Sequence, residues 1–143
     1  MIGSGRFSAR LVVPGDGPPV EHGVVAVDDG IITDVFAGPD TAATPLGNVI
    51  LLPGLVNAHT HLEFSTSTTP LPAENGMAAW IGDVVAARHH HADRTDPIRR
   101  GLDELVAAGT SAAGEIATSD WPASQLTDTD PTCVVFREII GLR

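Results

Sequence analysis

Hydrophobic residues in the first third of the chain come in short runs separated by turn-forming residues. The runs have the length of strands and are rich in β-branched residues, whereas the breaks contain proline, glycine and aspartate. Asp29 and Gly30 separate two of the runs, and glycine tolerates the positive φ that a tight hairpin turn requires. The pattern therefore predicts a small β module. Its expected strands cover residues 11–13, 23–27, 31–36 and 49–52, with a surface loop at 37–47.

The pattern changes after a Pro-Gly break at residues 53–54. A strand is expected at 55–64 and a polar loop at 65–74. Apolar residues then follow the i, i+3, i+4 spacing of one helix face, and this helix is expected to run to about residue 88 with Trp80 in the core. The expected apolar stripe consists of Met77, Trp80, Ile81, Val84 and Val85.

A second helix is expected between Asp96, a natural N-cap, and Gly109, which suits the position after a helix end. Strands are predicted at 110–117 and 133–140, joined by a loop or short helix at 119–132. The order of strand, helices, strand, connection and strand implies parallel pairing. The second half of the chain is therefore predicted to be α/β.

The strongest chemical signal is a pair of histidines, His59 and His61, in an extended apolar stretch. In a strand, residues i and i+2 point to the same face, so the two imidazoles can converge on one metal ion. The alternative to a metal site is that both histidines simply lie on the solvent-facing side of a strand. The apolar residues Leu55, Val56 and Leu62 around the pair favour metal ligation.

The string LPGLVNAHTHLE at residues 52–63 resembles the first barrel strand of the amidohydrolase superfamily. The resemblance is closest to the branch that contains cytosine, guanine and aminofutalosine deaminase-like enzymes and chlorohydrolases. It extends over most of the chain. The V-x-x-G-x-I-like turn at 27–31 resembles the β module that precedes the motif, and residues 101–116 and 136–142 resemble the second and third barrel strands with their preceding helix.

The resemblance implies a small β-sandwich module at residues 1–52, followed at 53–143 by an incomplete (β/α)8 TIM barrel. A whole barrel needs roughly 250 residues, so residues 53–143 have room for about its first three strands. The resemblance also implies a divalent metal at the barrel mouth, held in part by His59 and His61. Zinc is expected, with iron as the alternative because both metals accept imidazole ligands. The family's two remaining histidines, its aspartate and its general acid/base glutamate would belong to later parts of the barrel.

Other polar residues have both a functional and an ordinary interpretation. Glu63 shares a strand face with His61 and is a candidate for substrate binding or for ordering a neighbouring group, whereas the alternative is a rim carboxylate in water. Glu115 and Glu138 lie near strand ends, where barrel enzymes keep their chemistry, or they pair with an arginine. Three consecutive histidines at 89–91 cannot share one ion on a helix, so a solvated helix end is expected there.

Composition narrows the class of partner. The 143 residues carry 18 acidic side chains and eight arginines without any lysine, for a formal net charge of −10. Such a charge argues against a nucleic-acid or anionic-membrane partner and favours small molecules or other proteins as ligands. A small-molecule substrate is expected, and a homo-oligomer remains open. No apolar run is long enough to span a membrane and no signal peptide is apparent, so a cytoplasmic protein is expected. The single cysteine, Cys133, is expected to be a small core residue.

Two functions follow from these residues. In the first, the chain is the N-terminal part of a metal-dependent hydrolase that deaminates a heterocyclic amine through metal-activated water. In the second, it is a non-catalytic truncated product or pseudoenzyme with no independent function. A third, a complete small binding module, leaves the later strands without partners. We expect the chain by itself to be inactive, because residues that would move protons are not among those identified.

Overall fold

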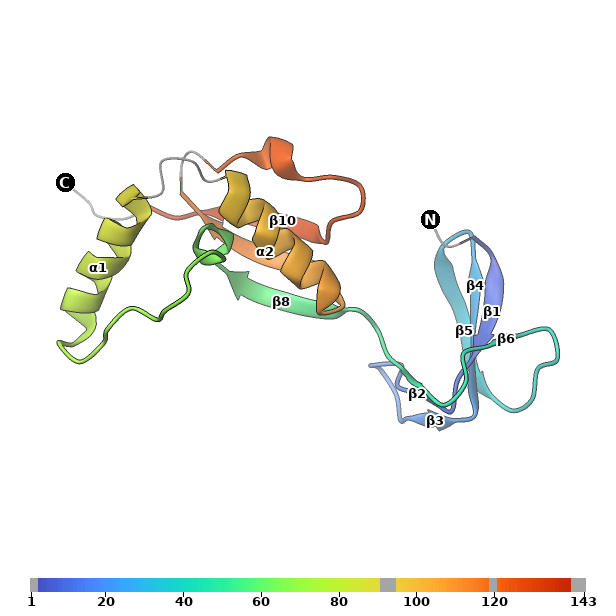
Figure 1. Cartoon of the computed structure of the whole chain (residues 1–143). Helices are drawn as coiled ribbons and strands as arrows, with labels where there is room; N and C mark the ends of the chain where they lie inside the picture. The colour runs from blue at the N-terminus through green and yellow to red at the C-terminus, as the bar shows by residue number, and fades with distance from the viewer. Residues whose placement is uncertain (1–2, 91–94, 119–120, 140–143) are drawn as a thin grey trace. The chain divides into compact units, whose positions relative to one another are not determined.

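The computed structural model describes residues 3–90, 95–118 and 121–139. The chain divides into two compact units, Met1–Pro53 and Gly54–Arg143. Figure 1 shows the strands of the first unit and the mixed strands and helices of the second. The mixed α/β class predicted from the sequence is confirmed. No helix in the described ranges is both long and apolar enough to cross a membrane.

The first unit is built from two small β-sheets. One has the strand order β5-β4-β1-β6 and the other has the order β3-β2-β7. The core of this unit contains Ala9, Val12 and Val25, with Val20, Val27, Val35 and Leu51 packed against them. The strands are β1 (Gly5–Ser8), β2 (Leu11–Val12), β3 (Val20–Glu21), β4 (Gly23–Asp28), β5 (Ile31–Ala37), β6 (Thr44–Pro45) and β7 (Ile50–Leu51).

The hairpin between β4 and β5 turns at the predicted dipeptide. Asp29 has φ 49° and Gly30 has φ 77°, the positive values that a tight hairpin turn of this kind requires. The two strands pair antiparallel on either side of the turn. The prediction of this hairpin is confirmed. The sequence pattern missed β1, β3 and β6, since β1 alternates with polar residues and the other two are only two residues long.

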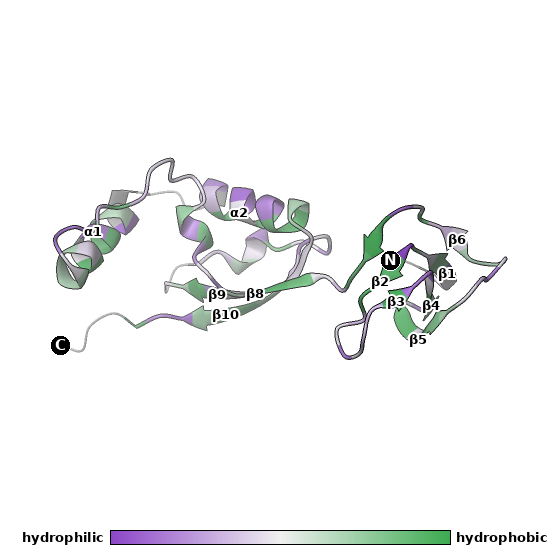
Figure 2. Cartoon of the chain, turned by 90° about the horizontal axis from the view of Figure 1, so that it is seen from below, coloured by the Kyte–Doolittle hydropathy of each residue, from purple (hydrophilic) through white to green (hydrophobic). Residues whose placement is uncertain are grey.

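The second unit is a three-stranded parallel sheet with one helix packed on it. The strand order is β10-β9-β8, so β9 is central and the predicted parallel pairing is confirmed. Helix α2 lies along one side of the sheet in both views (Figures 1 and 2). The elements are β8 (Leu55–Thr60), the 3-10 helix η1 (Leu62–Phe64), α1 (Met77–His90), α2 (Thr95–Ala107), β9 (Thr110–Ala117), the 3-10 helix η2 (Ala123–Gln125) and β10 (Thr132–Arg137).

The core of the second unit joins the histidine segment, residues 59–62, to α2. Leu62 of η1 packs with Ile98 and Leu102 of α2, and all three are buried. Half-buried Cys133 packs against this cluster, together with Leu105, Trp121 and Leu126. Burial of the α2 stripe is what fixes η1, and therefore the segment after His61, against the sheet.

Three expectations about this unit are wrong. The first strand ends at Thr60 rather than at residue 64, because the chain turns into η1. Helix α2 begins at Thr95, so Asp96 lies within its first turn instead of capping it. Trp80 is not a core residue, since 37% of it is exposed. Trp80 instead lines a cavity together with three other residues of the expected stripe, Ile81, Val84 and Val85.

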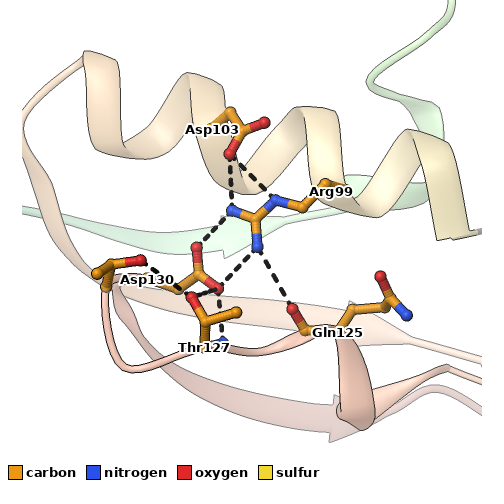
Figure 3. A network of polar contacts seen from close by, with 6 residues as sticks. Arg99, Asp103, Gln125, Thr127 and Asp130 are labelled. Atoms are coloured by element: carbon orange, nitrogen blue, oxygen red, sulfur yellow. Dashed lines mark hydrogen bonds and ion pairs between the residues drawn. The ribbon is translucent and has the colours of Figure 1, made fainter.

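An arginine-centred network fastens the connection after β9 to α2 (Figure 3). The Arg99 guanidinium donates to both oxygens of Asp130, to Asp103 and to the backbone carbonyl of Gln125. Asp130 also accepts the backbone N–H of Thr127, at 2.8 Å. These bonds hold the pKa of Asp130 well below its usual range and raise that of Arg99. The network fixes the entry into β10.

The sheet leaves apolar side chains exposed on edge strands. In β10, Val134, Val135 and Phe136 are 55%, 41% and 52% exposed, and in β8 Val56 is 70% exposed. Both strands have an unpaired edge in the described part of the sheet. An exposed apolar edge is a template for pairing with another chain.

We therefore predict that the isolated chain self-associates through this sheet. Val134→Glu should shift it toward monomer, because a charge on the edge strand opposes edge-to-edge pairing. Size-exclusion chromatography with light scattering measures the change. Ala123→Glu, which adds the same charge at an exposed position of η2, should leave the distribution unchanged. A monomeric wild type would contradict the prediction.

Candidate metal centre

The strand that carries the histidine pair contains a bulge. In the pairing of β8 with β9, Asn57 lies opposite Ala113 and Thr60 lies opposite Glu115, with a register shift between them. Ala58 and His59 therefore face the single residue Gly114. Bulges of this kind re-aim side chains and are common next to active sites. Here the bulge falls on the first histidine.

Two neighbours make this bulge possible. The side-chain oxygen Oδ1 of Asn57 accepts the backbone N–H of His59 at 3.2 Å and so gives that donor a partner at the bulge. Gly114 permits close approach, since a Cβ at that position would lie 2.5 Å from the carbonyl oxygen of Ala58. The residue types at 57 and 114 thus explain the local shape of β8.

The two histidine rings lie next to each other at the end of β8. Their centroids are 5.2 Å apart and their planes are inclined by 70°. An ion that binds two imidazole nitrogens at roughly 2.0–2.1 Å lies about 3 Å from each ring centre, so a tetrahedral ion would hold the two centres about 5 Å apart. His59 is exposed and His61 is half-buried. The spacing of these rings fits two ligands of one ion.

The described residues do not complete a ligand set. No group of three or more His, Cys, Asp or Glu side chains there could hold one metal ion. The pair therefore accounts for two ligands, and a tetrahedral site needs further ligands from water or from other residues. Of the histidines at 89–91, His91 lies outside the described residues, and His89 and His90 fall in the last turn of α1.

Arg88 of α1 links the histidine segment to two carboxylates. Its Nε donates to Glu63 Oε1 at 2.6 Å, and its NH2 nitrogen lies 2.8 Å from Glu138 Oε2. The side chains of Arg88 and Glu63 are only 6% and 5% exposed. Glu63 is thus a buried ion-pair partner, and the alternative of a rim carboxylate in water is wrong. A buried guanidinium of this kind needs its carboxylates, because loss of one partner leaves an uncompensated charge.

The same guanidinium also reaches the second histidine. The NH2 nitrogen of Arg88 lies 3.4 Å from Nδ1 of His61, and the guanidinium carbon lies 5.6 Å from the centre of the Phe64 ring. Since guanidinium only donates, the contact with His61 is a hydrogen bond when Nδ1 is unprotonated. A histidine that binds a metal through Nε2 carries its proton on Nδ1, so Arg88 must then rely on its two carboxylates.

A cavity of about 720 Å³ opens beside these residues. Its polar end contains His61, Arg88 and Glu138, and its apolar wall is the α1 stripe that was expected in the core. Glu63 does not line it. The apolar wall is formed by Trp80, Ile81, Val84 and Val85, and the loop after η1 contributes Leu71 beside Phe64 of η1 itself.

Behind the histidine segment lies Glu115, a fully buried carboxylate on the central strand β9. Both of its oxygens lie within hydrogen-bond distance of the backbone N–H of Leu62, at 3.2 and 3.1 Å, and Oε1 also accepts the indole N–H of Trp121 at 3.0 Å. Burial raises the pKa of Glu115 from 4.5 to about 7, although both donors lower it. The nearby charge of Glu63 raises it further. Glu115 does not pair with an arginine in the described part of the chain, whereas Glu138 does.

Sequence reasoning missed Arg88, Asn57, Gly114 and Trp121 at this site. Arg88 lies in helix α1, and the periodic pattern of that helix identifies its apolar positions but not a polar contact made by an arginine. Asn57 and Gly114 serve a bulge that periodicity cannot reveal. The only available signal was a glycine within a strand pattern, which is typical of a bulge or a close backbone approach.

No family model matches the chain. It is 30% identical over 105 residues to aminodeoxyfutalosine deaminase of a Nitratiruptor species, a match covering 72% of this chain and 26% of that protein. The fold is similar to that of Helicobacter pylori aminofutalosine deaminase in complex with methylthio-coformycin, with a TM-score of 0.75, 23% identity, and coverage of 96% of this chain and 36% of that one.

A second similar structure is that of an adenosine deaminase from Xanthomonas campestris with bound zinc. Its TM-score is 0.56 at 23% identity, covering 82% of this chain and 29% of that one. These three matched proteins are deaminases, and the resemblance of this chain to the amidohydrolase superfamily is confirmed. The chain spans about a quarter of the length of the first curated relative.

We predict that Gly114→Ala destabilises the second unit by about 1–3 kcal/mol, because the new methyl group must displace the Ala58 carbonyl. Both tryptophans, Trp80 and Trp121, lie in this unit, so urea unfolding followed by tryptophan fluorescence measures it selectively. Gly82→Ala in α1 is the matched control. A Cβ there meets nothing within 4 Å, and alanine favours a helix, so that variant should be neutral or more stable.

A second prediction concerns pH. Because the pKa of Glu115 is raised to about 7 in the folded unit, its neutral form is favoured there. Its contribution to stability is full below pH 4.5 and is lost as the pH rises through 7. The free energy of unfolding of Glu115→Gln, measured by tryptophan fluorescence, should lack this decline. Parallel curves for wild type and variant between about pH 4.5 and 8 would contradict the assignment.

Proposed function

We propose that this chain carries the first part of a metal-dependent hydrolase that acts on non-peptide C–N bonds, as a deaminase of a heterocyclic amine. The observation that carries the proposal is the 5.2 Å spacing of the His59 and His61 rings at the end of a parallel strand. The similarity to deaminases supports the reaction class. On this proposal, the first unit is the β-sandwich module of such an enzyme, and β8, β9 and β10 are the first three strands of its barrel.

His59 and His61 would hold a divalent metal, for which we propose zinc, with iron as the alternative. The zinc bound to a deaminase of similar fold supports this choice. When bound, such a metal lowers the pKa of a coordinated water toward about 7 and supplies hydroxide at neutral pH. The two histidines would contribute neutral imidazole nitrogens as ligands.

The cavity beside His61 gives the chain a role in binding a small-molecule substrate. Its α1 wall is apolar and includes the flat surface of Trp80, whereas Arg88 and Glu138 supply polar groups at the end near the histidine. A heterocycle that carries an amine has this same division between a flat apolar body and a polar edge. Glu63 serves the site by holding Arg88 in place, the ordering role among those expected for it.

A second candidate function is that of a non-catalytic chain. The observation in its favour is that the described residues contain no group of three metal-ligating side chains. Two histidines leave an ion largely in water, and the carboxylates nearest to them, Glu63, Glu115 and Glu138, are each engaged by structural partners. The chain by itself is therefore expected to release no ammonia from aminopurines, aminopyrimidines or their nucleosides with added zinc.

The test is a zinc titration of the chain at about pH 7.5, where imidazole is neutral, followed by the NMR signals of the histidine rings. The ring protons of His59 and His61 should shift together with one apparent dissociation constant, because both nitrogens bind the same ion. His59→Ala and His61→Ala should each weaken binding at least tenfold, since each removes one of two protein ligands.

Two control variants define the result. His22→Ala in the first unit and the triple change of His89, His90 and His91 to Ala should leave the shifts of His59 and His61 unchanged. Zinc affinity that persists in both single variants, or that is lost in the triple variant, would show that the pair is not the metal centre.

A further inference from the structure

Glu115 occupies a place where a carboxylate is costly. It lies on the central strand β9, with none of its surface exposed to solvent. Burial disfavours an ionised carboxylate, and an apolar side chain would serve a purely packed core better. A carboxylate at this buried position is therefore expected to accept specific hydrogen bonds.

Such a bond is formed at the start of η1. The N–H of Leu62 is the first donor of η1, and the leading donors of a helical turn have no partner within the turn itself. His61 stands at the N-cap position of η1, with φ −127° and ψ 82°, and its side chain makes no capping bond. Glu115 supplies the missing acceptor from another strand, at 3.2 and 3.1 Å.

The capped peptide joins His61 to Leu62. Its orientation sets ψ of His61, and with it the direction in which the chain leaves β8 toward η1. Because Leu62 is also buried against α2, the peptide is held from both sides. The imidazole of His61 is then placed relative to that of His59, whose own backbone N–H is bound by Asn57. The backbone at each histidine is thus bound by one side chain, Asn57 at His59 and Glu115 at the peptide after His61.

Trp121 fixes the carboxylate in turn. Its indole N–H donates to Oε1 of Glu115, the oxygen that also lies 3.2 Å from the Leu62 nitrogen. The chain of contacts runs from Trp121 through Glu115 to the peptide after His61. Groups that orient a metal ligand through hydrogen bonds typically change metal affinity about 10–100-fold when they are removed.

We propose that Glu115 is a positioning residue of the metal centre: by accepting the Leu62 N–H, it fixes the peptide after His61 and so sets the distance between the two imidazoles. The inference rests on the proposed function of His59 and His61. On this inference, zinc affinity depends mainly on where the acceptor oxygen of residue 115 lies and only secondarily on its charge.

Two conservative substitutions separate geometry from charge. Glu115→Gln keeps an acceptor oxygen at the position of Oε1, which lies 3.2 Å from the Leu62 nitrogen and 3.0 Å from the Trp121 nitrogen, but it removes the charge and replaces Oε2 by an NH2 group that cannot accept. Glu115→Asp keeps the charge but is one methylene shorter and cannot reach the Leu62 N–H. In the zinc titration followed by histidine NMR, Gln should stay within about threefold of the wild-type affinity, whereas Asp should lose about tenfold or more. The joint shift of the two rings should be lost with Asp.

Asp130→Ala provides the matched control for general destabilisation. Asp130 is also a buried carboxylate of the second unit that accepts a backbone N–H, but its partners are Thr127 and Arg99. That variant should unfold more easily in urea and still bind zinc within about threefold of wild type. Circular dichroism establishes the folded fraction of every variant before titration.

Three results would overturn the inference. A tenfold loss of zinc affinity with Glu115→Gln would show that the charge is decisive. Wild-type affinity with Glu115→Asp would show that the contact does not position His61. An equal loss of affinity with Asp130→Ala would show that stability alone is responsible. If Asp does not fold, a tenfold loss with Gln would still overturn the inference. Failure of the proposed function is distinct, since His59→Ala and His61→Ala would then bind zinc as the wild type does.

Discussion

Two residues of β8, Ala58 and His59, lie opposite the single residue Gly114 of β9, and the geometry of the histidine pair depends on how this mismatch is accommodated. A side chain at position 114 would collide with the Ala58 carbonyl. The backbone N–H of His59 donates to the side chain of Asn57. At the start of η1, the backbone N–H of Leu62 donates to Glu115. A strand in regular register would place His59 differently and would not need either polar side chain.

The polar residues around His59 and His61 fall into two groups with different roles. Glu115 and Trp121 lie behind the histidine segment, where burial makes each hydrogen bond valuable and each missing partner costly. Arg88, Glu63 and Glu138 join α1 to η1 and to the residue after β10, and two of them face the cavity. Helix α1 is thereby held at its C-terminal end by an ion pair, while its apolar stripe lines the space in which we propose that a substrate binds.

Much of this arrangement could be predicted from the sequence. The Asp29-Gly30 hairpin, the strand at 110–117 and the parallel pairing follow from local preferences and from side-chain period, whereas His61 lies beyond the end of β8 and the closeness of its ring to that of His59 does not follow from strand period alone. The turn after Thr60, the bulge at His59 and the burial of Glu63 could not be predicted, because each depends on contacts across the sheet. Trp80 was misplaced for a related reason: periodicity identifies an apolar face but not whether a second layer or a cavity lies against it.

The central claim is that His59 and His61 bind one metal ion together. X-ray absorption spectroscopy of the chain with less than one equivalent of zinc tests it most directly, because imidazole scattering counts the histidine ligands. The account predicts about two imidazole nitrogens at roughly 2.0–2.1 Å with oxygen ligands completing the shell, and loss of the imidazole scattering when both histidines are replaced by alanine. Imidazole scattering that survives the double replacement, or that is absent from the wild type, would contradict it.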